Sequence, residues 1–301
     1  MASTIGWELY RTFLSVLNEG SLSGAARSLG ITQPTAGRHI AVLEKALGLA
    51  LFTRSPTGLL PTEAALALRP QAEAMESTAA SLERTAASQG DGVRGVVRVT
   101  ASDIIGVEVL PLIAGQLRRE HPELEIELVL TNQVQDLLRR EADIAVRMTP
   151  PKQEMLIARR VGKIELGLYA TKDYLEMHGV PRNIDDLSRH TLVGFDTENA
   201  FIRAARKSLP NLNRKMFTLR TDSDLAILAL IRAGAGLGVC QVPLARRPGG
   251  EPLVRVLSRQ ISLSLETWIT MHEDLRNRPS CRVTFDALVA GLQRHVAAGS
   301  G

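Results

Sequence analysis

The sequence predicts an α/β protein in which a small helical N-terminal domain precedes a long helix and a larger domain of alternating strands and helices. Three observations predict this organisation. Residues 21–47 contain two short segments of helical apolar periodicity separated by a glycine, which is typical of a helical hairpin. Residues 68–86 carry apolar side chains at heptad spacing, and strand and helix patterns alternate after them. We therefore expect domains at residues 1–62 and 93–301, joined by a helix over residues 63–89.

The composition is that of a protein with a sizeable core. The 301 residues are 45% hydrophobic, the formal net charge is +4 and the pI is about 9.3. A mildly basic chain is compatible with nucleic-acid binding but does not establish it. Two cysteines make a disulfide framework unlikely and offer no metal-site spacing, and the N-terminus has no signal-peptide pattern. The longest wholly apolar run, residues 225–231, is too short to span a bilayer, so we expect a cytoplasmic protein that contacts no membrane.

Capping residues in residues 21–47 predict a helix-turn-helix. Ser21 suits the N-cap of a first helix, and Gly30 suits the left-handed position that ends it. Thr32 can cap a second helix with Pro34 in its first turn, where a missing N–H costs little. An earlier helix over residues 7–18 supports the pair through an apolar stripe formed by Leu9, Phe13, Leu14 and Leu17. An ordinary helical hairpin has the same spacing, so the spacing alone leaves both interpretations open.

The second helix of the pair has one apolar and one polar face. Ile40, Leu43 and Leu47 recur at spacings of three and four and face inward. On the opposite face, Gln33 can read adenine, and Arg38 can read guanine or bind a phosphate. After this helix, an apolar strand, a Pro/Gly turn and a second strand over residues 51–62 predict a wing.

Residues 7–63 resemble the winged helix-turn-helix of the LysR-type transcriptional regulators. The resemblance is carried by several short motifs together, including WELYRTF at 7–13, GSLSGAA at 20–26, TQPT at 32–35 and LFTR at 51–54. It implies binding to double-stranded promoter DNA through Gln33, Pro34, Thr35, Arg38, His39, Arg54 and Thr57. Each of these could instead be a solvated surface side chain. The chain departs from the family pattern at Gly37 and Ala41, where a serine and a basic residue are usual, which implies lower affinity or a different set of contacts.

The helix over residues 63–88 contains a coiled-coil seam. Apolar positions spaced 4, 3, 4, 3 and 4 apart form it: Leu68, Ala72, Met75, Ala79, Leu82 and Ala86. Small alanines on this stripe favour a partner helix over a single helix lying on its own domain. The resemblance implies the family's linker helix, which pairs two protomers in a homodimer or homotetramer. Pro70 lies inside the pattern, so we expect a kink or a break near Arg69.

Beyond residue 96, strands and helices alternate as in a doubly wound parallel sheet. The pattern changes near Gly162, which predicts two lobes, with lobe I at about residues 93–161 and 266–301 and lobe II at about 162–265. The domain resembles the family's effector-binding domain, similar in fold to type 2 periplasmic solute-binding proteins. Residues 169–190 resemble those of the CrgA-type and aromatic-acid-responsive subgroup.

In open α/β sheets, ligands bind beyond the carboxyl ends of the strands. This rule selects Ser102, Asp103, Thr131, Asn132, Arg147, Phe195 and Asp196 as candidate effector-binding residues. The resemblance implies that Ser102 and Thr131 hold the effector, often a carboxylate, with help from helix N-terminal amides. Three alternatives stay open. Asp103 can be a helix N-cap, Phe195 can be a core residue, and Arg147 can pair with Asp143 or Asp222.

No catalytic constellation stands out. The GAGLG stretch at 234–238 follows a helix rather than a strand, which is wrong for a phosphate cradle. The six histidines form no metal pair at helical spacing, and G-x-S-x-G does not occur. We expect a DNA-binding transcriptional regulator, not an enzyme, that needs no metal or cofactor and responds to a small-molecule co-inducer. RNA polymerase is a further candidate partner. The alternative is a cytoplasmic small-molecule-binding protein whose N-terminal helices only dimerise.

Overall fold

The computed structural model describes residues 5–55, 58–87, 92–132, 142–151, 156–198, 200–206, 213–247 and 252–299. These form two compact units, one up to residue 86 and one from residue 87 onward. Each unit has its own hydrophobic core. The glycine-containing stretch at residues 89–95 is expected to be a hinge, and residues 134–140 are expected to be a helix. Residues 89–91 of the first and all of the second lie outside the described residues.

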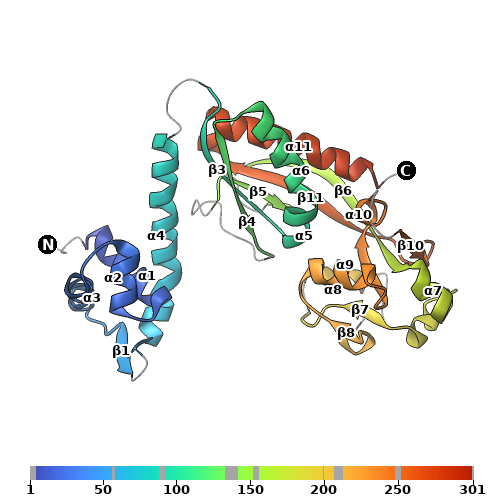
Figure 1. The fold of residues 1–301 in the computed structure, drawn as a ribbon, viewed down its shortest axis with the longest axis horizontal. Coiled ribbons are helices and arrows are strands. Elements are labelled where there is room, and N and C mark those ends of the chain that lie inside the picture. The colour runs from blue at the N-terminus through green and yellow to red at the C-terminus, as the bar shows by residue number, and fades with distance from the viewer. Residues whose placement is uncertain are drawn as a thin grey trace. The chain divides into compact units, whose positions relative to one another are not determined.

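The N-terminal unit is a three-helix domain with a two-stranded wing and a long final helix (Figure 1). Its elements are α1 (Trp7–Glu19), α2 (Leu22–Leu29), α3 (Gln33–Leu47), β1 (Phe52–Ser55), β2 (Gly58–Pro61) and α4 (Glu63–Ala87). The predicted caps are confirmed. The Ser21 side chain accepts the Gly24 N–H at 3.1 Å, Gly30 has φ 65°, and Thr32 Oγ1 accepts the Thr35 N–H at 3.3 Å.

The core of this unit joins the helices to the wing. Phe13, Leu43 and Leu51 are fully buried in it, and the Phe13 and Phe52 ring centroids are 5.8 Å apart. Glu44 Oε1 accepts the Leu51 N–H at 2.7 Å and the Phe52 N–H at 3.2 Å. One carboxylate of α3 therefore fixes the start of the wing.

Helix α4 runs through Pro70 without a break. Of the expected kink or break, the break is wrong, because the proline removes one hydrogen bond while the flanking turns remain helical; the kink stays a prediction. The seam is divided between two environments. Leu68 and Ala72 pack into the N-terminal core, whereas Met75 and Leu82 are 40% and 62% exposed. The outer part of the seam thus leaves apolar side chains uncovered.

The C-terminal unit contains one mixed sheet with helices packed on it (Figure 1). Its first half contains β3 (Gly95–Ala101), α5 (Asp103–Glu108), α6 (Leu110–Glu120), β4 (Leu124–Leu130), β5 (Ile144–Arg147), β6 (Leu156–Thr171) and α7 (Lys172–His178). Its second half contains β7 (Leu192–Gly194), α8 (Ala200–Ala205), β8 (Leu219–Arg220), α9 (Asp224–Arg232), β9 (Leu237–Gln241), α10 (Val242–Ala245), β10 (Leu253–Val256), β11 (Leu263–His272) and α11 (Pro279–Ala297). Short 3₁₀ turns lie between some of these elements.

The strand order is β4-β3-β5-β11-β6-β9-β7-β8, with β10 also paired to β6. Strands β3, β4 and β5 are parallel, as are β7, β8 and β9, so each lobe has the predicted parallel strands. Between them, β11 pairs antiparallel with both β5 and β6, and β6 pairs antiparallel with β9. The change of pattern near Gly162 does not end a strand: β6 passes through Gly162 and pairs with β11 on both sides of it, with a register shift between Thr267 and Trp268.

Strands β6 and β11 therefore run through both lobes. Lobe I carries α5, α6 and α11, and the last helix packs against β3, β6, β11 and α6 as predicted. Lobe II carries α7, α8, α9 and α10. In the described part of the chain, every helix is too short or too polar to cross a membrane.

Candidate functional site

The exposed face of α3 carries three of the predicted DNA-contacting residues. Gln33, Pro34 and Arg38 are exposed, while Ala36, Ile40 and Leu43 on the other face are buried. The Thr35 hydroxyl lies 2.9 Å from the Thr32 hydroxyl, so Thr35 takes part in the cap of the helix. The N-terminal end of α3, where a recognition helix presents side chains to base edges, is thereby fixed.

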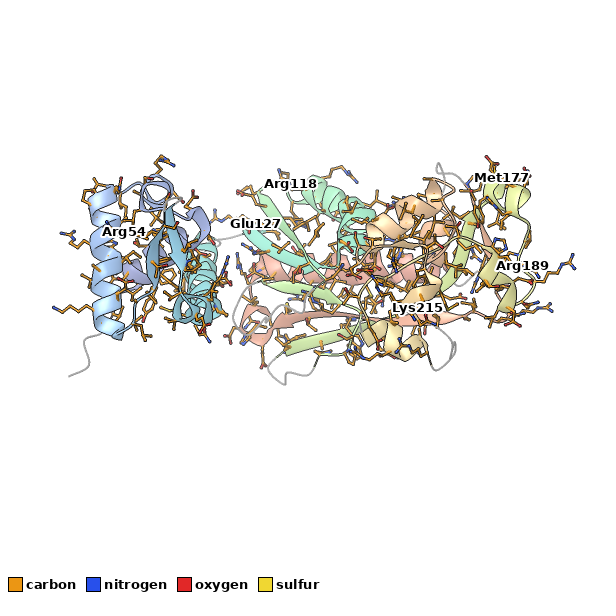
Figure 2. The ribbon with its side chains drawn as sticks, turned by 90° about the horizontal axis from the view of Figure 1, so that it is seen from below. Arg54, Arg118, Glu127, Met177, Arg189 and Lys215 are labelled. Atoms are coloured by element: carbon orange, nitrogen blue, oxygen red, sulfur yellow. The ribbon has the colours of Figure 1, made fainter. Side chains whose placement is uncertain are left out.

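His39 has a packing contact that the sequence did not show. Its Nδ1 lies 2.8 Å from Thr12 Oγ1, which ties α3 to α1 and leaves the ring half-buried. Arg54 is exposed on β1 (Figure 2). Thr57 lies outside the described residues. DNA contact by these three residues stays a prediction.

The turn end of the wing, at the start of β2, is held against the end of α1. The Leu59 N–H donates to the Gly20 carbonyl at 2.9 Å. Gly58 has φ 135°, and a Cβ there would lie 2.7 Å from the same carbonyl oxygen. Only a glycine allows this close approach in that conformation.

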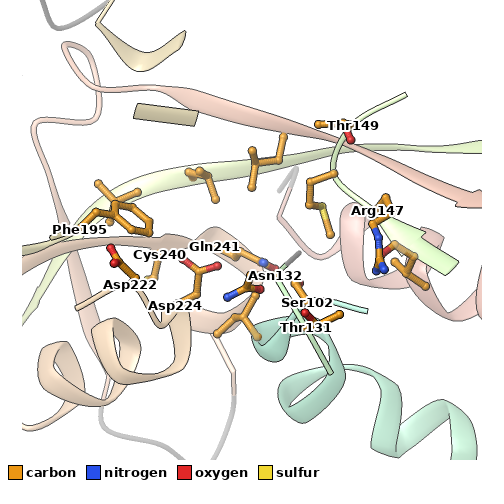
Figure 3. Close-up of a pocket in the computed structure, with 16 residues that line it drawn as sticks. Ser102, Thr131, Asn132, Arg147, Thr149, Phe195, Asp222, Asp224, Cys240 and Gln241 are labelled. Carbon is orange, nitrogen blue, oxygen red and sulfur yellow. The ribbon is translucent and has the colours of Figure 1, made fainter. Parts of the chain in front are cut away.

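A cavity of about 280 Å³ lies between the two lobes of the C-terminal unit (Figure 3). Five of the seven predicted effector-binding residues line it, namely Ser102, Thr131, Asn132, Arg147 and Phe195. Side chains from both lobes and from the two crossing strands complete the wall: Ile104, Val146, Met148, Thr149, Leu166, Asp222, Asp224, Val239, Cys240, Gln241 and Leu265. The rule that ligands bind beyond strand carboxyl ends therefore located the cavity.

Asp103, predicted to bind the effector, is not among the residues that line this cavity. Its Oδ1 accepts the Ile104 N–H at 2.7 Å, and its Oδ2 accepts a hydrogen bond from Ser223 Oγ at 2.8 Å. Because Ser223 caps α9 in lobe II, this bond joins the two lobes. The N-cap position belongs to Ser102, so Asp103 is also not the cap.

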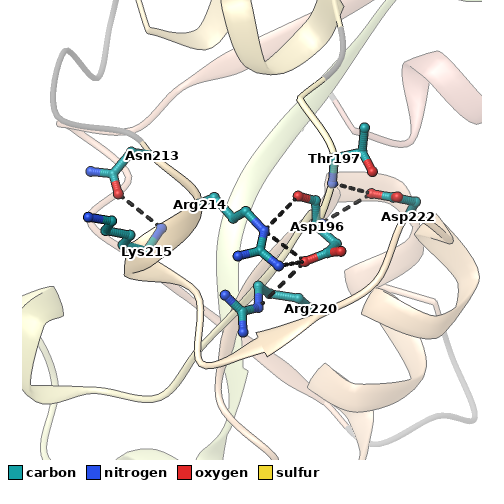
Figure 4. Close-up of polar contacts among 7 residues, drawn as sticks. All are labelled: Asp196, Thr197, Asn213, Arg214, Lys215, Arg220 and Asp222. Carbon is teal, nitrogen blue, oxygen red and sulfur yellow. Dashed lines mark hydrogen bonds and ion pairs between the residues drawn. The ribbon is translucent and has the colours of Figure 1, made fainter.

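Asp196, also predicted to bind the effector, is not among the lining residues and is paired with arginines instead (Figure 4). Its carboxylate is exposed and pairs with Arg214 at 2.6 Å and with Arg220 at 3.6 Å. These two arginines neutralise the carboxylate of Asp196 within lobe II. The neighbouring Asp222 accepts the Asp196 and Thr197 N–H groups at 3.1 and 2.9 Å, which holds the loop after β7 in place.

Arg147 enters the cavity from β5 without a carboxylate partner in the described chain. Its Nη2 donates to Thr100 Oγ1 at 3.0 Å and its Nη1 to the Val146 carbonyl at 2.9 Å. The alternative of a structural ion pair is wrong, since Asp143 accepts the Arg98 N–H and Asp222 accepts backbone N–H groups of its own lobe. Burial lowers the pKa of Arg147. The buried Nε of Arg147 and the buried Oγ of Ser102 have no hydrogen-bond partner among the described residues.

Asp224 also lines the cavity, although it was not among the residues selected from the sequence. It begins α9, directly after β8, so the strand-end rule applied to that strand would have selected it. Burial, with the nearby charge of Asp103, raises the pKa of Asp224 to about 6. Cys240 also lines the cavity, but burial raises the pKa of its thiol to about 12, which makes it a poor nucleophile.

A second contact between the lobes involves Glu108 at the end of α5. Its Oε1 lies 2.8 Å from Arg232 Nη1 and its Oε2 lies 2.7 Å from Arg247 Nη1. The carboxylate is largely buried, and both of its oxygens accept charge-assisted hydrogen bonds from these arginines. No cluster of three or more His, Cys, Asp or Glu side chains within the described ranges is placed to hold a metal.

Two family models match the chain. Residues 7–66 match the bacterial regulatory helix-turn-helix protein, lysR family, and residues 90–293 match the LysR substrate binding domain. The chain belongs to the LysR family. This LysR-family chain therefore joins a regulatory DNA-binding module to a substrate-binding module, and the match decides against N-terminal helices that only dimerise.

Known proteins similar to this LysR-family chain are regulators. An HTH-type transcriptional regulator of Xanthomonas campestris is 29% identical over 178 residues, which are 59% of this chain and 52% of that protein's length. The regulator CrgA of Neisseria meningitidis is 27% identical over 183 residues, 61% of each chain. The structure of full-length CbnR complexed with its target DNA shares the fold, with a TM-score of 0.66 at 20% identity, covering 98% of this chain and 99% of that one.

Proposed function

We propose that this LysR-family protein binds specific promoter duplexes in the cytoplasm through α3 and the wing, and that a small molecule in the inter-lobe cavity changes this binding. The observation that carries the proposal is the division of α3 into two faces. Ile40 and Leu43 anchor the helix in the core, which leaves Gln33, Pro34 and Arg38 exposed at its N-terminal end. Glutamine and arginine in this position can read base edges in the major groove.

Two copies of the chain form the DNA-binding assembly in this proposal. The outer part of the α4 seam exposes Met75 and Leu82, and burying such side chains against a second α4 removes apolar surface from water. Two-fold pairing would place two α3 helices on an inverted repeat, because half-site symmetry follows protein symmetry. Further pairing of dimers gives the homotetramer. Contact with RNA polymerase would follow if the protein activates transcription.

The test is selection of bound duplexes from a random DNA pool at physiological salt, followed by affinity measurements on the enriched sequence. The wild-type protein is expected to enrich an interrupted inverted repeat. Arg38→Ala should weaken binding to it by about ten-fold or more, the loss of one good base or phosphate contact per half-site.

Lys45→Ala is the matched control, since it removes one positive charge from the C-terminal end of the same helix. It should keep the selected sequence and change affinity little. Enrichment of no sequence by the wild-type protein, or equal effects of the two substitutions, would contradict the proposed recognition surface.

A further inference from the structure

The inter-lobe cavity carries opposite charges on its two sides. Arg147 comes from β5 of lobe I, and Asp224 comes from the start of α9 in lobe II. Figure 3 shows Arg147 toward one end of the cavity, beside Ser102 and Thr131, and Asp224 toward the other, on the side of Asp222. The cavity therefore has a positively charged group at one end and a negatively charged group at the other.

Neither charge is neutralised by the described part of the protein. The two hydrogen bonds of Arg147 go to neutral oxygens, and it forms no ion pair with a described residue. The Asp224 carboxylate makes no hydrogen bond or ion pair with another described side chain, and Asp103 is close enough to repel it. Both side chains are half-buried, and a partly desolvated charge without a partner is costly, so each of these groups is better satisfied by a ligand of opposite charge than by water.

The other acidic groups near Asp224 are already engaged. Asp103 accepts the hydroxyl of Ser223, and Asp222 accepts two backbone N–H groups. The Gln241 side-chain oxygen lies 2.8 Å from His295 Nε2. Asp103 and Asp222 keep their negative charge, but Asp224 is the carboxylate of the three to which no described side chain donates a hydrogen bond and whose backbone neighbours leave it unoccupied, so it is the one we assign to a ligand.

A simpler interpretation is that Asp224 only stabilises the N-terminus of α9. An aspartate in the first turn of a helix does so, and Asp173 holds the same kind of position in α7. Asp173 is exposed, however, which shows that the helix effect needs no burial. The half-buried position of Asp224 in the cavity wall is left unexplained by the helix alone.

Apolar side chains lie between the two charged ends. Ile104, Val146, Met148, Leu166 and Leu265 line the cavity together with Phe195. A ligand that satisfies both ends would therefore place a hydrocarbon body against these walls, where burial is favourable.

We propose that the cavity takes a zwitterion with a carboxylate at one end for Arg147 and a protonated amine at the other for Asp224, separated by an apolar body. This inference rests on the proposed function, in that it names the ligand class of the proposed effector site. Arg147, with the unpartnered Ser102 hydroxyl, binds the carboxylate by charge-assisted hydrogen bonds. Asp224 selects the amine, and a ligand with a carboxylate alone leaves it unpaired.

The test is isothermal titration of the full-length protein with matched triplets. One triplet is para-aminomethylbenzoate, para-methylbenzoate and benzylamine; the other is ε-aminohexanoate, hexanoate and hexylamine. At least one zwitterion is expected to bind about ten-fold or more tightly than both of its single-charge analogues, because each analogue leaves one buried charge unpaired.

Asp224→Asn should remove this advantage and leave the affinity for the carboxylate analogue equal or higher. The matched control Asp173→Asn makes the same charge change at an exposed helix start and should alter none of the affinities. Because Asp224→Asn removes a disfavoured charge, the variant should stay folded, which its unfolding temperature checks.

Equal binding of the carboxylate analogues and the zwitterions would overturn the amine assignment and leave an anionic effector in place. Binding of no member of either triplet would also overturn it. Neither result affects the outcome of the DNA selection experiment, which tests the proposed function separately.

Discussion

Asp224 shows how one side chain can be held in a state that the fold disfavours. Its folded-state pKa is raised from the usual 3.8 to about 6 by burial and by Asp103. A raised carboxyl pKa contributes stability that is fully present below the unfolded pKa and is lost as pH rises through the folded pKa. At neutral pH the ionised Asp224 therefore lowers the free energy of unfolding, which is a cost typical of binding sites.

We expect Asp224→Asn to stabilise the protein in a pH-dependent way. The gain over wild type should be near zero at about pH 4, grow between about pH 4 and pH 6, and then stay constant at about 1–3 kcal/mol. Urea unfolding of the wild type and of Asp224→Asn across this range measures it. A gain that is the same at every pH would contradict the assignment.

The wild-type curve alone would be ambiguous because of His295. Burial lowers the pKa of His295 to about 4, so the unfolded chain takes up a proton between pH 6.5 and 4 that the folded chain does not. This lowers stability as pH falls, opposite to the contribution of Asp224. The difference between wild type and Asp224→Asn removes the shared contribution of His295.

At the scale of elements, α3 is fixed at both ends and has a weak point between them. The Thr32 cap and the Gly48 left-handed end set its length. Gly37 lies in the middle, where a Cβ would meet only Leu22 Cδ1 at 3.6 Å, an ordinary contact. The backbone freedom of this glycine is therefore not needed for packing.

Gly37→Ala is expected to raise the free energy of unfolding by about 0.5–1 kcal/mol, the helix-propensity difference between the two residues. Ala41→Gly, at an exposed position of the same helix, is the reverse control and should lower it by a similar amount. Chemical denaturation measures both. A loss of stability in Gly37→Ala would mean that the helix needs the glycine for a reason its packing does not show.

The wing leads to a different expectation for Gly58. Gly58→Ala should cost about 2–4 kcal/mol, because the added Cβ both strains a positive φ and approaches the Gly20 carbonyl. Gly48→Ala is the control, since its φ is 66° but nothing lies within 4 Å of its Cβ, and it should cost only about 1 kcal/mol. Equal costs in denaturation would show that the close approach to Gly20 contributes nothing.

At the scale of the whole chain, the two units have separate cores and each contains one tryptophan. Trp7 lies against the N-terminal core, and Trp268 lies on β11. Separate cores imply two cooperative transitions, each reported by its own fluorophore.

Leu43→Ala should lower the free energy of unfolding of the N-terminal unit, followed by Trp7, by about 2–5 kcal/mol, because it opens a cavity in that core only. The transition of the C-terminal unit, followed by Trp268, should stay unchanged. Leu228, in α9, is buried to a similar degree, and Leu228→Ala should destabilise the C-terminal unit and leave the N-terminal unit unchanged. Trp268→Phe and Trp7→Phe backgrounds assign each signal. A single transition shifted by both leucine substitutions would show that the units unfold together.

Features set by local sequence patterns could be predicted from the sequence, whereas features set by long-range contacts could not. Caps, helical periodicity and strand ends are local patterns, and they predicted α1 to α4 and the position of the cavity. Asp103 and Asp196 were misplaced because their partners are distant in sequence: Ser223 faces Asp103, and Arg214 and Arg220 pair with Asp196. The contact between His39 and Thr12 is likewise long-range. The antiparallel centre of the sheet was not predicted, because the sequence of β11 does not indicate that it pairs with β5 and β6, which are far away in the chain.

The two long strands have a consequence for how such a chain can be recombined. Lobe II is an insertion between two parts of lobe I, entered along β6 and left along β11. A gene fusion with one junction would therefore split a lobe between two parents. An exchange of a whole lobe needs two junctions that meet in space, and the pair of Gly162 and Thr267, opposite each other in the β6–β11 register, provides them.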